Sequence, residues 1–413
     1  MRAYLQFLRA NVRFLAVGFL LALCSTFGQT FYIAMYSEPI RAAFDLSHGE
    51  FGELYGLGTL ASGTLIIFIG ALIDRVDLRV YVVVLVAAMG GACWLMSGTA
   101  NAWTLVLAIF ALRICGQGLL SQAATVTMAR YFDAGTRGRA VSVAALGFPS
   151  GQAIFPPLAV ALLSVVAWRD AWQWSATAVV VVMPAVLLWL LRGHGERHAA
   201  LEARIRANAT PLGDAGSGDS PQWNRRMVLR DPRFFFAMVA MLAPSFIITG
   251  LNFHQVLLVQ EKGWDLQFYA AGFAIYAGCQ VASSIVTGTV IDRVGSRRVA
   301  GYYLLPLAAA SASLSLFEHQ LAVVAFMAFA GMSGGAGQTV VSTLWAELYG
   351  VRHLGSIRAL VAGMAVISSA AAPAVFGWFI DAGVRVDTLS AWCAGYAVCG
   401  AVILRWLFSR RRG

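Results

Sequence analysis

Two ionisable side chains stand deep inside long apolar stretches of this sequence. Arg113 lies in the run 102–129 and His254 in the run 234–258. A guanidinium group can grip a carboxylate through two parallel hydrogen bonds, and an imidazole titrates near neutral pH and can carry a proton. If its run is a helix, Arg113 lies about 16 Å from the start of the run. The structural alternative makes Arg113 the partner of a helix carbonyl or glutamine and His254 a hydrogen-bonded packing residue.

Neutral polar side chains accompany these two residues and could line a binding cavity, although each alone is more often a packing residue. With Arg113 and His254, the candidates are Tyr32, Gln117, Gln152, Gln255, Tyr276, Gln280, Gln338 and Trp345. Glu53, near one end of the run 51–73, is the second candidate proton carrier, unless it is a solvated acid at a helix start. Because no Asp or Glu stands in the middle of a run, the set favours a small anion or zwitterion over an organic cation.

A charged motif follows the second and the eighth apolar runs in nearly the same form. GALIDRVDLR contains Gly70, Asp74, Arg75 and Arg79, and GTVIDRVGSRR contains Gly288, Asp292, Arg293 and Arg297. The glycines would let another helix approach closely, and the aspartates would meet the positive N-terminal end of a neighbouring helix. Each copy could therefore be a latch that gates one half against the other. The alternative is a basic loop that only sets the orientation of the chain.

The elements that must position these residues are apolar runs long enough to cross a bilayer. The chain is 59% hydrophobic and 12% charged, whereas soluble domains carry about 25% charged residues. A span needs about 20 apolar residues, so we expect an all-α polytopic membrane protein with twelve transmembrane helices. The runs are 14–36, 51–73, 80–98, 102–129, 140–166, 172–191, 234–258, 267–291, 299–317, 321–347, 359–383 and 389–408.

An internal repeat divides these runs into two sets of six. Asp292 follows Asp74 by 292 minus 74, or 218, positions, and Arg358 and Pro373 follow Arg139 and Pro156 at nearly the same offset. The sequence thus predicts two pseudo-symmetric six-helix bundles, 1–191 and 234–413, joined by the polar linker 192–233. The linker is expected to be a tether; a regulatory or partner-binding segment is the alternative.

Charge distribution predicts the orientation and the partners. The net charge is +10, but the arginines cluster at run ends on one side, as the positive-inside rule requires, rather than in a groove for nucleic acid. We therefore expect a bacterial inner-membrane protein with both termini cytoplasmic, surrounded by lipid, without a nucleic-acid partner and functioning as a monomer.

Motifs of catalysis and of cofactor binding are missing from the sequence. Its six cysteines all fall inside apolar runs without a CxxC pair, which favours packing residues over disulfides or metal ligands. No P-loop, zinc spacing or GxSxG motif is present. We expect no enzyme activity, no cofactor and no metal, and transport driven by an ion gradient rather than by ATP.

Twelve spans, a long central loop and the doubled charged motif together resemble the major facilitator superfamily over essentially the whole chain. The resemblance implies a cargo cavity near the membrane midplane, with the eight residues of the two charged motifs at gating positions. Asp77 stands where the family pattern usually has Gly. Arg113 to Gly118 looks like the arginine motif of the fourth helix. In GFPSGQAIFPP, Gln152 replaces the proline of the antiporter signature, which weakens a drug-antiporter assignment.

A nearer resemblance, to the monocarboxylate and oxalate/formate branch, rests on ARYFDAGTRGRA and ELYGVRHLGSIRA. The basic substrate residues of that branch are absent from the runs 267–291 and 359–383. The sequence thus predicts a secondary transporter of a small organic anion, coupled to protons and working by alternating access. The alternative is an efflux transporter for neutral or amphipathic molecules.

Overall fold

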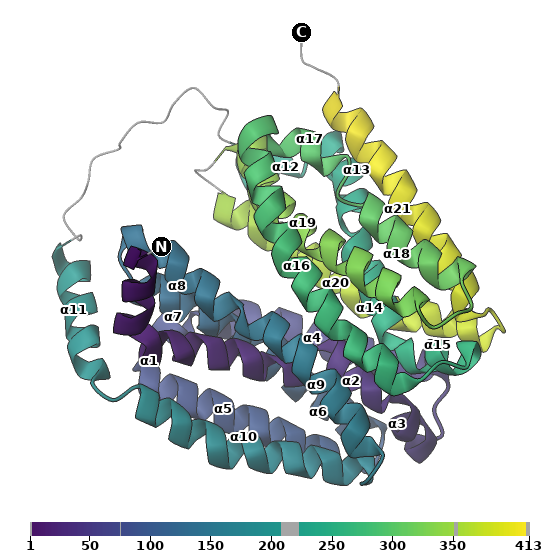
Figure 1. Cartoon of the computed structure of the whole chain (residues 1–413), viewed down its shortest axis with the longest axis horizontal. Coiled ribbons are helices and arrows are strands. Elements are labelled where there is room, and N and C mark those ends of the chain that lie inside the picture. Colours follow the sequence, from purple (N-terminus) through teal and green to yellow (C-terminus); the bar gives the residue numbers. More distant parts are fainter. Residues whose placement is uncertain (1, 75, 208–222, 351–353, 410–413) are drawn as a thin grey trace. The chain divides into compact units, whose positions relative to one another are not determined.

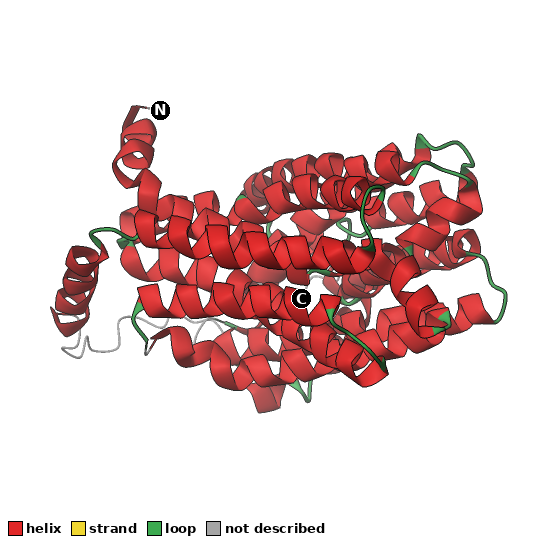
Figure 2. Cartoon of the chain, turned by 90° about the horizontal axis from the view of Figure 1, so that it is seen from below, coloured by secondary structure: helices red, strands yellow, loops and turns green. Residues whose placement is uncertain are grey.

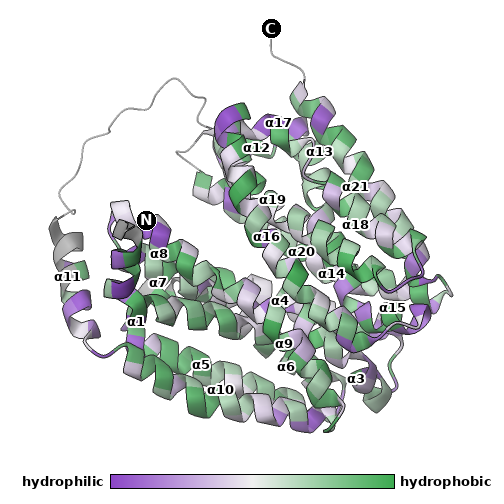
Figure 3. Cartoon of the chain, in the orientation of Figure 1, coloured by the Kyte–Doolittle hydropathy of each residue, from purple (hydrophilic) through white to green (hydrophobic). Residues whose placement is uncertain are grey.

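The computed structural model describes residues 2–74, 76–207, 223–350 and 354–409, which are helical and contain no strand (Figure 2). Twelve helical segments of this part are long and apolar enough to cross a membrane, six in each sequence half. The predicted all-α polytopic fold with two repeated halves is therefore confirmed. Hydrophobic residues cover most of the helix length and hydrophilic residues gather near helix ends (Figure 3).

The first half contains fourteen helical elements and is followed by the linker helix α11 (Figure 1). They are α1 (Arg2–Cys24), η1 (Ser25–Gly28), α2 (Thr30–Ile33), η2 (Ala34–Tyr36), α3 (Ser37–Phe44), α4 (His48–Ile69), η3 (Gly70–Asp74), α5 (Leu78–Ser97), α6 (Ala102–Leu112), η4 (Arg113–Leu120), α7 (Ser121–Tyr131), α8 (Ala134–Ala145), α9 (Gly147–Leu163), α10 (Trp168–Leu190) and α11 (His194–Ala207).

The second half is built in the same way, with short helices α12 and α17 near span ends. Its elements are α12 (Arg225–Val228), α13 (Pro232–Met241), α14 (Ala243–Phe253), α15 (Gln255–Lys262), α16 (Leu266–Val294), α17 (Ser296–Ala300), α18 (Leu305–Leu316), α19 (Ala322–Tyr349), α20 (Leu354–Asp381) and α21 (Val386–Ser409).

Two predicted span boundaries are wrong in ways that matter later. The first span is Leu5–Gly28 rather than 14–36, because Gln29 adopts an extended backbone and ends the helix after Gly28. The eleventh span begins at Leu354 rather than at 359, so it contains Arg358. The expectation that no basic residue lies in that span therefore fails. An arginine in the second turn of a helix breaks an apolar run without breaking the helix.

Contacts divide the chain into two compact units, each described by itself. Unit 1 comprises Met1–Tyr32, Ala61–Phe155 and Leu162–Gly218, and unit 2 comprises Ile33–Leu60, Pro156–Ala161 and Asp219–Gly413. The start of α4 thus belongs to the same unit as α13 to α21. The predicted domain bounds 1–191, 192–233 and 234–413 describe the sequence repeat and stay a prediction.

In unit 1, helix backbones approach one another at glycines. A Cβ atom on Gly147 of α9 would lie 2.0 Å from the carbonyl oxygen of Phe19, and one on Gly151 would lie 2.1 Å from the hydroxyl oxygen of Thr26. The spacing of these two glycines, GxxxG, therefore lets α9 pack closely, with Gly147 against α1 and Gly151 against η1. A second crossing joins η1 to η4, where a Cβ on Gly116 would lie 2.6 Å from the Cα of Gly28.

In unit 2, the long helices α16 and α19 run side by side (Figure 1). A Cβ atom on Gly331 would lie 2.3 Å from the carbonyl oxygen of Tyr276, and one on Gly335 would lie 2.1 Å from that of Gln280. The glycines of α19 therefore admit the backbone of α16 at close range. No side chain larger than hydrogen fits at these two positions without separating the helices.

The linker helix α11 packs against α1 and α7 within unit 1. The ring of His194 stacks on Phe14 of α1 at 6.3 Å between centroids, and the guanidinium of Arg197 lies 4.9 Å from the same ring. The hydroxyl of Tyr131, at the end of α7, lies 3.4 Å from His194 Nε2 and 3.1 Å from His198 Nδ1. The start of the predicted tether is thus a docked helix. Residues 208–222 lie outside the described part.

The α1–α9 crossing yields a direct test of backbone contact. Gly147→Ala should lower the free energy of unfolding by about 1–3 kcal/mol, because the added methyl group meets a backbone carbonyl that cannot move aside. Thermal unfolding of the purified protein in detergent measures the change. The matched control is Gly91→Ala on α5, where nothing lies within 4 Å of the added Cβ. A Gly147→Ala protein as stable as the control would contradict the packing.

Candidate functional site

A cavity of about 470 Å³ lies within unit 2, between α13, α14, α19 and α20. Much of its wall is apolar, with Met238, Met241, Val341, Val361 and Trp345 among the lining residues. Small residues leave the space open, since Gly334 and Gly337 face it from α19 and Ala362 and Ala365 from α20. The volume lies in the range of small-molecule sites, which is about 300–1,000 Å³.

The polar groups of this cavity include one positive charge and two buried groups that lack a hydrogen-bond partner in the described part of the chain. The indole N–H of Trp345 and the hydroxyl of Tyr303 are buried and have no hydrogen-bond partner within the described residues. Arg358, exposed in the second turn of α20, is the one charged residue among the described lining residues. Buried donors in folded proteins nearly always find an acceptor. The cavity therefore suits a ligand with an apolar body and acceptor oxygen atoms.

Two of the ten predicted cargo-binding residues line this cavity. Gln338 and Trp345 are lining residues on α19. Tyr276 and Gln280, predicted with them, instead face the glycine-rich part of α19, where the hydroxyl of Tyr276 lies 2.9 Å from the Cβ position of Gly334. Neither residue is among the described lining residues of this cavity, and their role as cargo ligands stays a prediction. In a helix buried on several sides, the apolar pattern does not reveal which neighbour a polar residue faces.

Arg113 is 2% exposed and takes part in the packing of η4. Its Nη1 donates to the carbonyl oxygen of Gly28, at 3.1 Å, and to the hydroxyl oxygen of Thr30, at 3.3 Å. The surrounding segment Arg113–Leu120 is π-helical, a widened turn that often marks functional positions. The structure thus supplies the structural partner weighed in the sequence, and a role for Arg113 in binding cargo stays a prediction.

The other predicted residues of unit 1 lie on different elements. Tyr32 packs among Phe27, Phe155 and Trp172, with its hydroxyl 3.5 Å from that of Ser175. Gln152 on α9 and Gln117 on η4 each have a buried amide oxygen without a partner in the described part. These two acceptors could take a hydrogen bond from a ligand, and their role as cargo ligands stays a prediction.

His254 and Gln255 lie at the break between α14 and α15, in unit 2. His254 is 3% exposed, and its Nε2 donates to the carbonyl oxygen of Pro373 on α20 at 3.1 Å. Its ring stacks on Phe376 and lies 5.6 Å from the ring of His48. Gln255 is fully buried. The imidazole is therefore enclosed where α4 meets α20.

We call the contact of α4 with α20 in unit 2 the α4–α20 seam. A Cβ atom on Gly52 would lie 2.5 Å from the carbonyl oxygen of Pro373, and one on Gly56 would lie 2.7 Å from that of Ala370. Asp381 ends α20 and accepts hydrogen bonds from the backbone N–H groups of His48 and Gly49, at 3.0 and 2.8 Å. A carboxylate at the start of a helix interacts favourably with the helix dipole.

Glu53 lies at the exposed side of the seam, where one of its carboxylate oxygens accepts a hydrogen bond of 2.8 Å from the indole N–H of Trp378. Glu53 and His254, the two predicted proton carriers, thus both belong to the seam. The seam itself was missed in the sequence. The spacing Gly49, Gly52, Gly56 on one face of α4 was the signal that could have revealed it.

The first charged motif is held by α7. Gln122 donates to the carbonyl oxygen of Gly70 at 3.4 Å, and Arg130 donates to that of Ile73 at 2.7 Å. Asp77 caps α5 by accepting from the backbone N–H of Arg79. Its φ of −55° needs no glycine, so the departure from the family pattern costs nothing. The side chain of Asp74, and Arg75 altogether, lie outside the described residues.

The second charged motif differs from its prediction. Asp292 and Arg293 are exposed, and Asp292 has no hydrogen-bond partner within the described residues. Glu347 takes the predicted place at a helix start instead, accepting from the backbone N–H and hydroxyl of Ser296. Arg297 pairs with Glu347 at 3.3 Å. Gly288 makes no close approach, because a Cβ there would meet only Thr339, at 4.0 Å. In the second half, the contact at a helix start that was predicted for Asp292 is therefore made by Glu347.

Comparison with known families decides the class of protein. The family model of the Major Facilitator Superfamily matches residues 18–278 and 255–413. The chain belongs to the major facilitator superfamily. It is therefore a transporter of that superfamily rather than an enzyme, which agrees with the expectation from its motifs. No curated protein sequence matches the chain.

Solved structures of major facilitator transporters share the fold at low identity. The nucleoside transporter NupG has a TM-score of 0.72 at 14% identity, covering 97% of this chain and 99% of NupG. A bacterial homologue of the human lysosomal transporter Spinster, inward-facing and unoccupied, gives 0.64 at 15% identity, covering 96% and 95%. The xylose transporter XylE from E. coli, in an inward open conformation, gives 0.64 at 15% identity, covering 97% and 96%. At these identities the likeness concerns the fold.

The environment of Arg113 predicts that its substitution is felt without any ligand. Arg113→Gln should lower the free energy of unfolding by about 1–3 kcal/mol, because the buried carbonyl of Gly28 loses its donor. Thermal unfolding of the ligand-free protein is the measurement. Arg137→Gln, at an exposed arginine on α8, removes the same charge and serves as control. If the Arg113→Gln protein were as stable as wild type but failed to transport, Arg113 would instead be a cargo-binding residue.

Proposed function

We propose that this transporter is a secondary transporter of a small organic anion of the carboxylate type with an apolar body. The observation that carries the proposal is the donor character of the unit 2 cavity. Arg358 contributes the positive charge, Trp345 and Tyr303 contribute unpartnered donors, and no carboxylate stands among the described lining residues. A ligand carboxylate supplies the acceptors these groups lack, whereas an organic cation would find no acid.

The nearer sequence resemblance to the monocarboxylate and oxalate/formate branch supports the same substrate class. Arg358 lies in the segment ELYGVRHLGSIRA that carries that resemblance, and in the eleventh span, where the branch has a basic substrate residue. The guanidinium of Arg113 and the amides of Gln117 and Gln152 are proposed as cargo ligands of the first half. With Tyr32 they stay candidate ligands.

A second candidate function, the efflux of neutral or amphipathic molecules, is favoured by the apolar wall of the same cavity. Met238, Met241, Val341 and Val361 offer dispersion contacts to any apolar body. Methionine walls adapt to different shapes, as binders of varied ligands require. The two functions differ in one respect, which is whether binding needs the ligand's negative charge.

The charge requirement is tested with matched ligands. Arg358→Gln should weaken binding of an apolar-chain monocarboxylate about five- to tenfold, because an exposed charge-assisted hydrogen bond is lost. Binding of the corresponding neutral amide should not change. The measurement is the ligand-induced rise in unfolding temperature, followed by uptake of the labelled acid into proteoliposomes. Arg298→Gln, an exposed arginine of the same half outside the cavity, is the control. Equal binding of acid and amide would favour the second function.

We propose further that transport proceeds by alternating access with the α4–α20 seam as one closing contact. The charged motifs are proposed as gating elements, with Gly70, Asp74, Arg75 and Arg79 in the first half. Gly288, Asp292, Arg293 and Arg297 are the corresponding residues of the second half, where the Arg297–Glu347 ion pair joins the motif to α19. Opening the seam would break the two hydrogen bonds that Asp381 accepts from the start of α4.

Proton coupling is proposed to run through His254. In the closed seam its Nε2 proton is used in the bond to Pro373, and an added proton would place a cation in a site 3% exposed to solvent. An opened seam would hydrate the ring and permit protonation near the ordinary histidine pKa of about 6.5. Protonation therefore favours the open seam, and closure requires loss of the proton. Glu53, bonded to Trp378, is the second proposed carrier.

Substitution of His254 should abolish coupling to protons but leave exchange of the carboxylate intact. His254→Gln should retain exchange of the labelled carboxylate across proteoliposomes but lose accumulation driven by an imposed pH gradient, since no group binds the proton in the open seam. Exchange and accumulation rates measured side by side decide the point. Accumulation that survives in His254→Gln and disappears in Glu53→Gln would transfer the coupling role to Glu53.

We also propose a bacterial inner-membrane location with both termini cytoplasmic, and function as a monomer. The clustering of arginines at one set of helix ends supports this orientation.

A further inference from the structure

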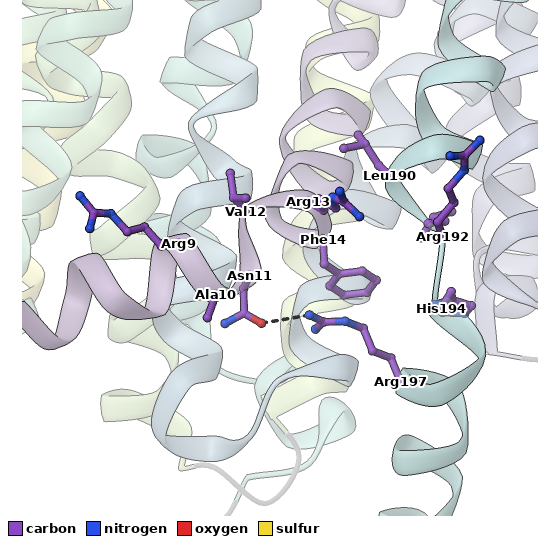
Figure 4. Close-up of a pocket in the computed structure, with 11 residues that line it drawn as sticks. Arg9, Ala10, Asn11, Val12, Arg13, Phe14, Leu190, Arg192, His194 and Arg197 are labelled. Carbon is purple, nitrogen blue, oxygen red and sulfur yellow. Dashed lines mark hydrogen bonds between the residues drawn. The ribbon is translucent and has the colours of Figure 1, made fainter.

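A small, strongly basic pocket lies in unit 1, outside the proposed cargo site. It occupies about 230 Å³ where the start of α1 meets the end of α10 and the first turn of α11 (Figure 4). Arg9, Arg13, Arg192 and Arg197 line it together with Asn11 and His194. Its lining contains no carboxylate within the described residues. Arg9, Arg13 and Arg192 are exposed and Arg197 is half-buried, so the four positive charges surround the pocket and favour a negatively charged ligand there.

Contacts inside the protein hold two of the arginines without neutralising them. Arg197 Nη2 donates to the amide oxygen of Asn11 at 3.2 Å and its guanidinium lies over Phe14. Arg13 lies 5.3 Å from the ring of Trp189. None of the four arginines pairs with a carboxylate in the described part of the chain. Partial burial lowers the pKa of Arg197, as expected for a guanidinium that loses water without gaining an acid.

His194, which also lines the pocket, has one ring nitrogen without a hydrogen-bond partner in the described part of the chain. The side chain is 2% exposed, its Nε2 lies near the hydroxyl of Tyr131, and its Nδ1 is buried without a hydrogen-bond partner among the described residues. Burial, followed by opposing effects of Asp77 and Arg79, lowers the pKa of His194. The ring is therefore neutral at neutral pH, and it offers hydrogen bonding rather than charge.

The pocket lies where the membrane-spanning segments end. The first span runs from Leu5 to Gly28 and the sixth ends at Leu190, so Arg9, Arg13 and Arg192 lie near the boundary of the apolar layer. Phe14, Leu190 and Leu191 form the apolar part of the lining. Arginines bind phosphate oxygens in pairs of parallel hydrogen bonds, and basic pockets between spans at this level suit anionic head groups.

We infer that this pocket binds an anionic phosphate group. A phospholipid head group and a soluble phosphate compound share that chemistry. Because Arg9 and Arg13 belong to α1 whereas His194 and Arg197 belong to α11, a bound phosphate joins the linker helix to the first half. A phosphate bound in the pocket thus holds α11, the first part of the linker, against α1.

Titrations of the purified full-length protein in detergent test the inference. Short-chain phosphatidylglycerol, short-chain phosphatidylcholine and inorganic phosphate are added separately, and the rise in unfolding temperature gives an apparent Kd. The test variant is Arg9→Gln/Arg192→Gln, because both residues are exposed and neither side chain makes a hydrogen bond or ion pair among the described residues. The control is Arg137→Gln/Arg139→Gln, which removes the same charge from exposed positions on α8, outside the pocket.

Phosphatidylglycerol is expected to stabilise the wild-type protein more than phosphatidylcholine, with an apparent Kd about thirtyfold weaker in the test variant, at roughly fivefold for each arginine. The control variant should bind like wild type. Saturable stabilisation by inorganic phosphate, lost in the same test variant, would support a soluble phosphate compound as the ligand. Equal stabilisation by all three additives, or equal loss in both variants, would overturn the inference.

Discussion

Close approach of helix backbones at glycine is the constraint on which the rest of this structure depends. Apolar helices in a bilayer gain little from hiding apolar surface against each other, so contact distance and internal hydrogen bonds must hold them together. Gly147 against α1, Gly116 against η1, Gly52 against α20 and Gly335 against α16 are four such contacts. Two of the polar side chains discussed above, Arg113 and His254, lie beside such contacts.

Arg113 and His254 illustrate this dependence. Each donates to a backbone carbonyl beside a glycine contact, Gly28 at the η1–η4 crossing and Pro373 at the α4–α20 seam. A buried donor so close to a crossing serves packing first, because the carbonyl it meets would otherwise be left without a partner. These N–H groups can take part in transport only in a conformation in which their hydrogen bonds to the backbone carbonyls are broken. This is why stability and transport need to be measured separately for these residues.

The fold was predictable from the sequence because its signals are local. Span length, arginine clusters and a repeated motif each need only a short stretch of sequence, and the spans follow from them. The site was predictable only in part. Gln338 and Trp345 line the cavity, but Tyr276 and Gln280 face α19, because lipid-facing and protein-facing sides of a span are both apolar. Arg358 was missed because α20 begins before the apolar run from which the span was predicted. Glu347, rather than Asp292, accepts the hydrogen bond at the start of α17, because a repeated sequence motif need not keep the same contacts.

The α4–α20 seam has a consequence for the speed of conformational change. At Gly52 and Gly56 the facing surfaces are glycine hydrogens and backbone carbonyls, while the side-chain contacts of His254 and Trp378 lie beside them. The faces at these two glycines have no interlocked rotamers to rearrange before they separate. At these positions, the barrier to separating α4 from α20 is then set by hydration of the backbone carbonyls rather than by repacking of side chains. Such a contact can be tight in one conformation and still separate rapidly.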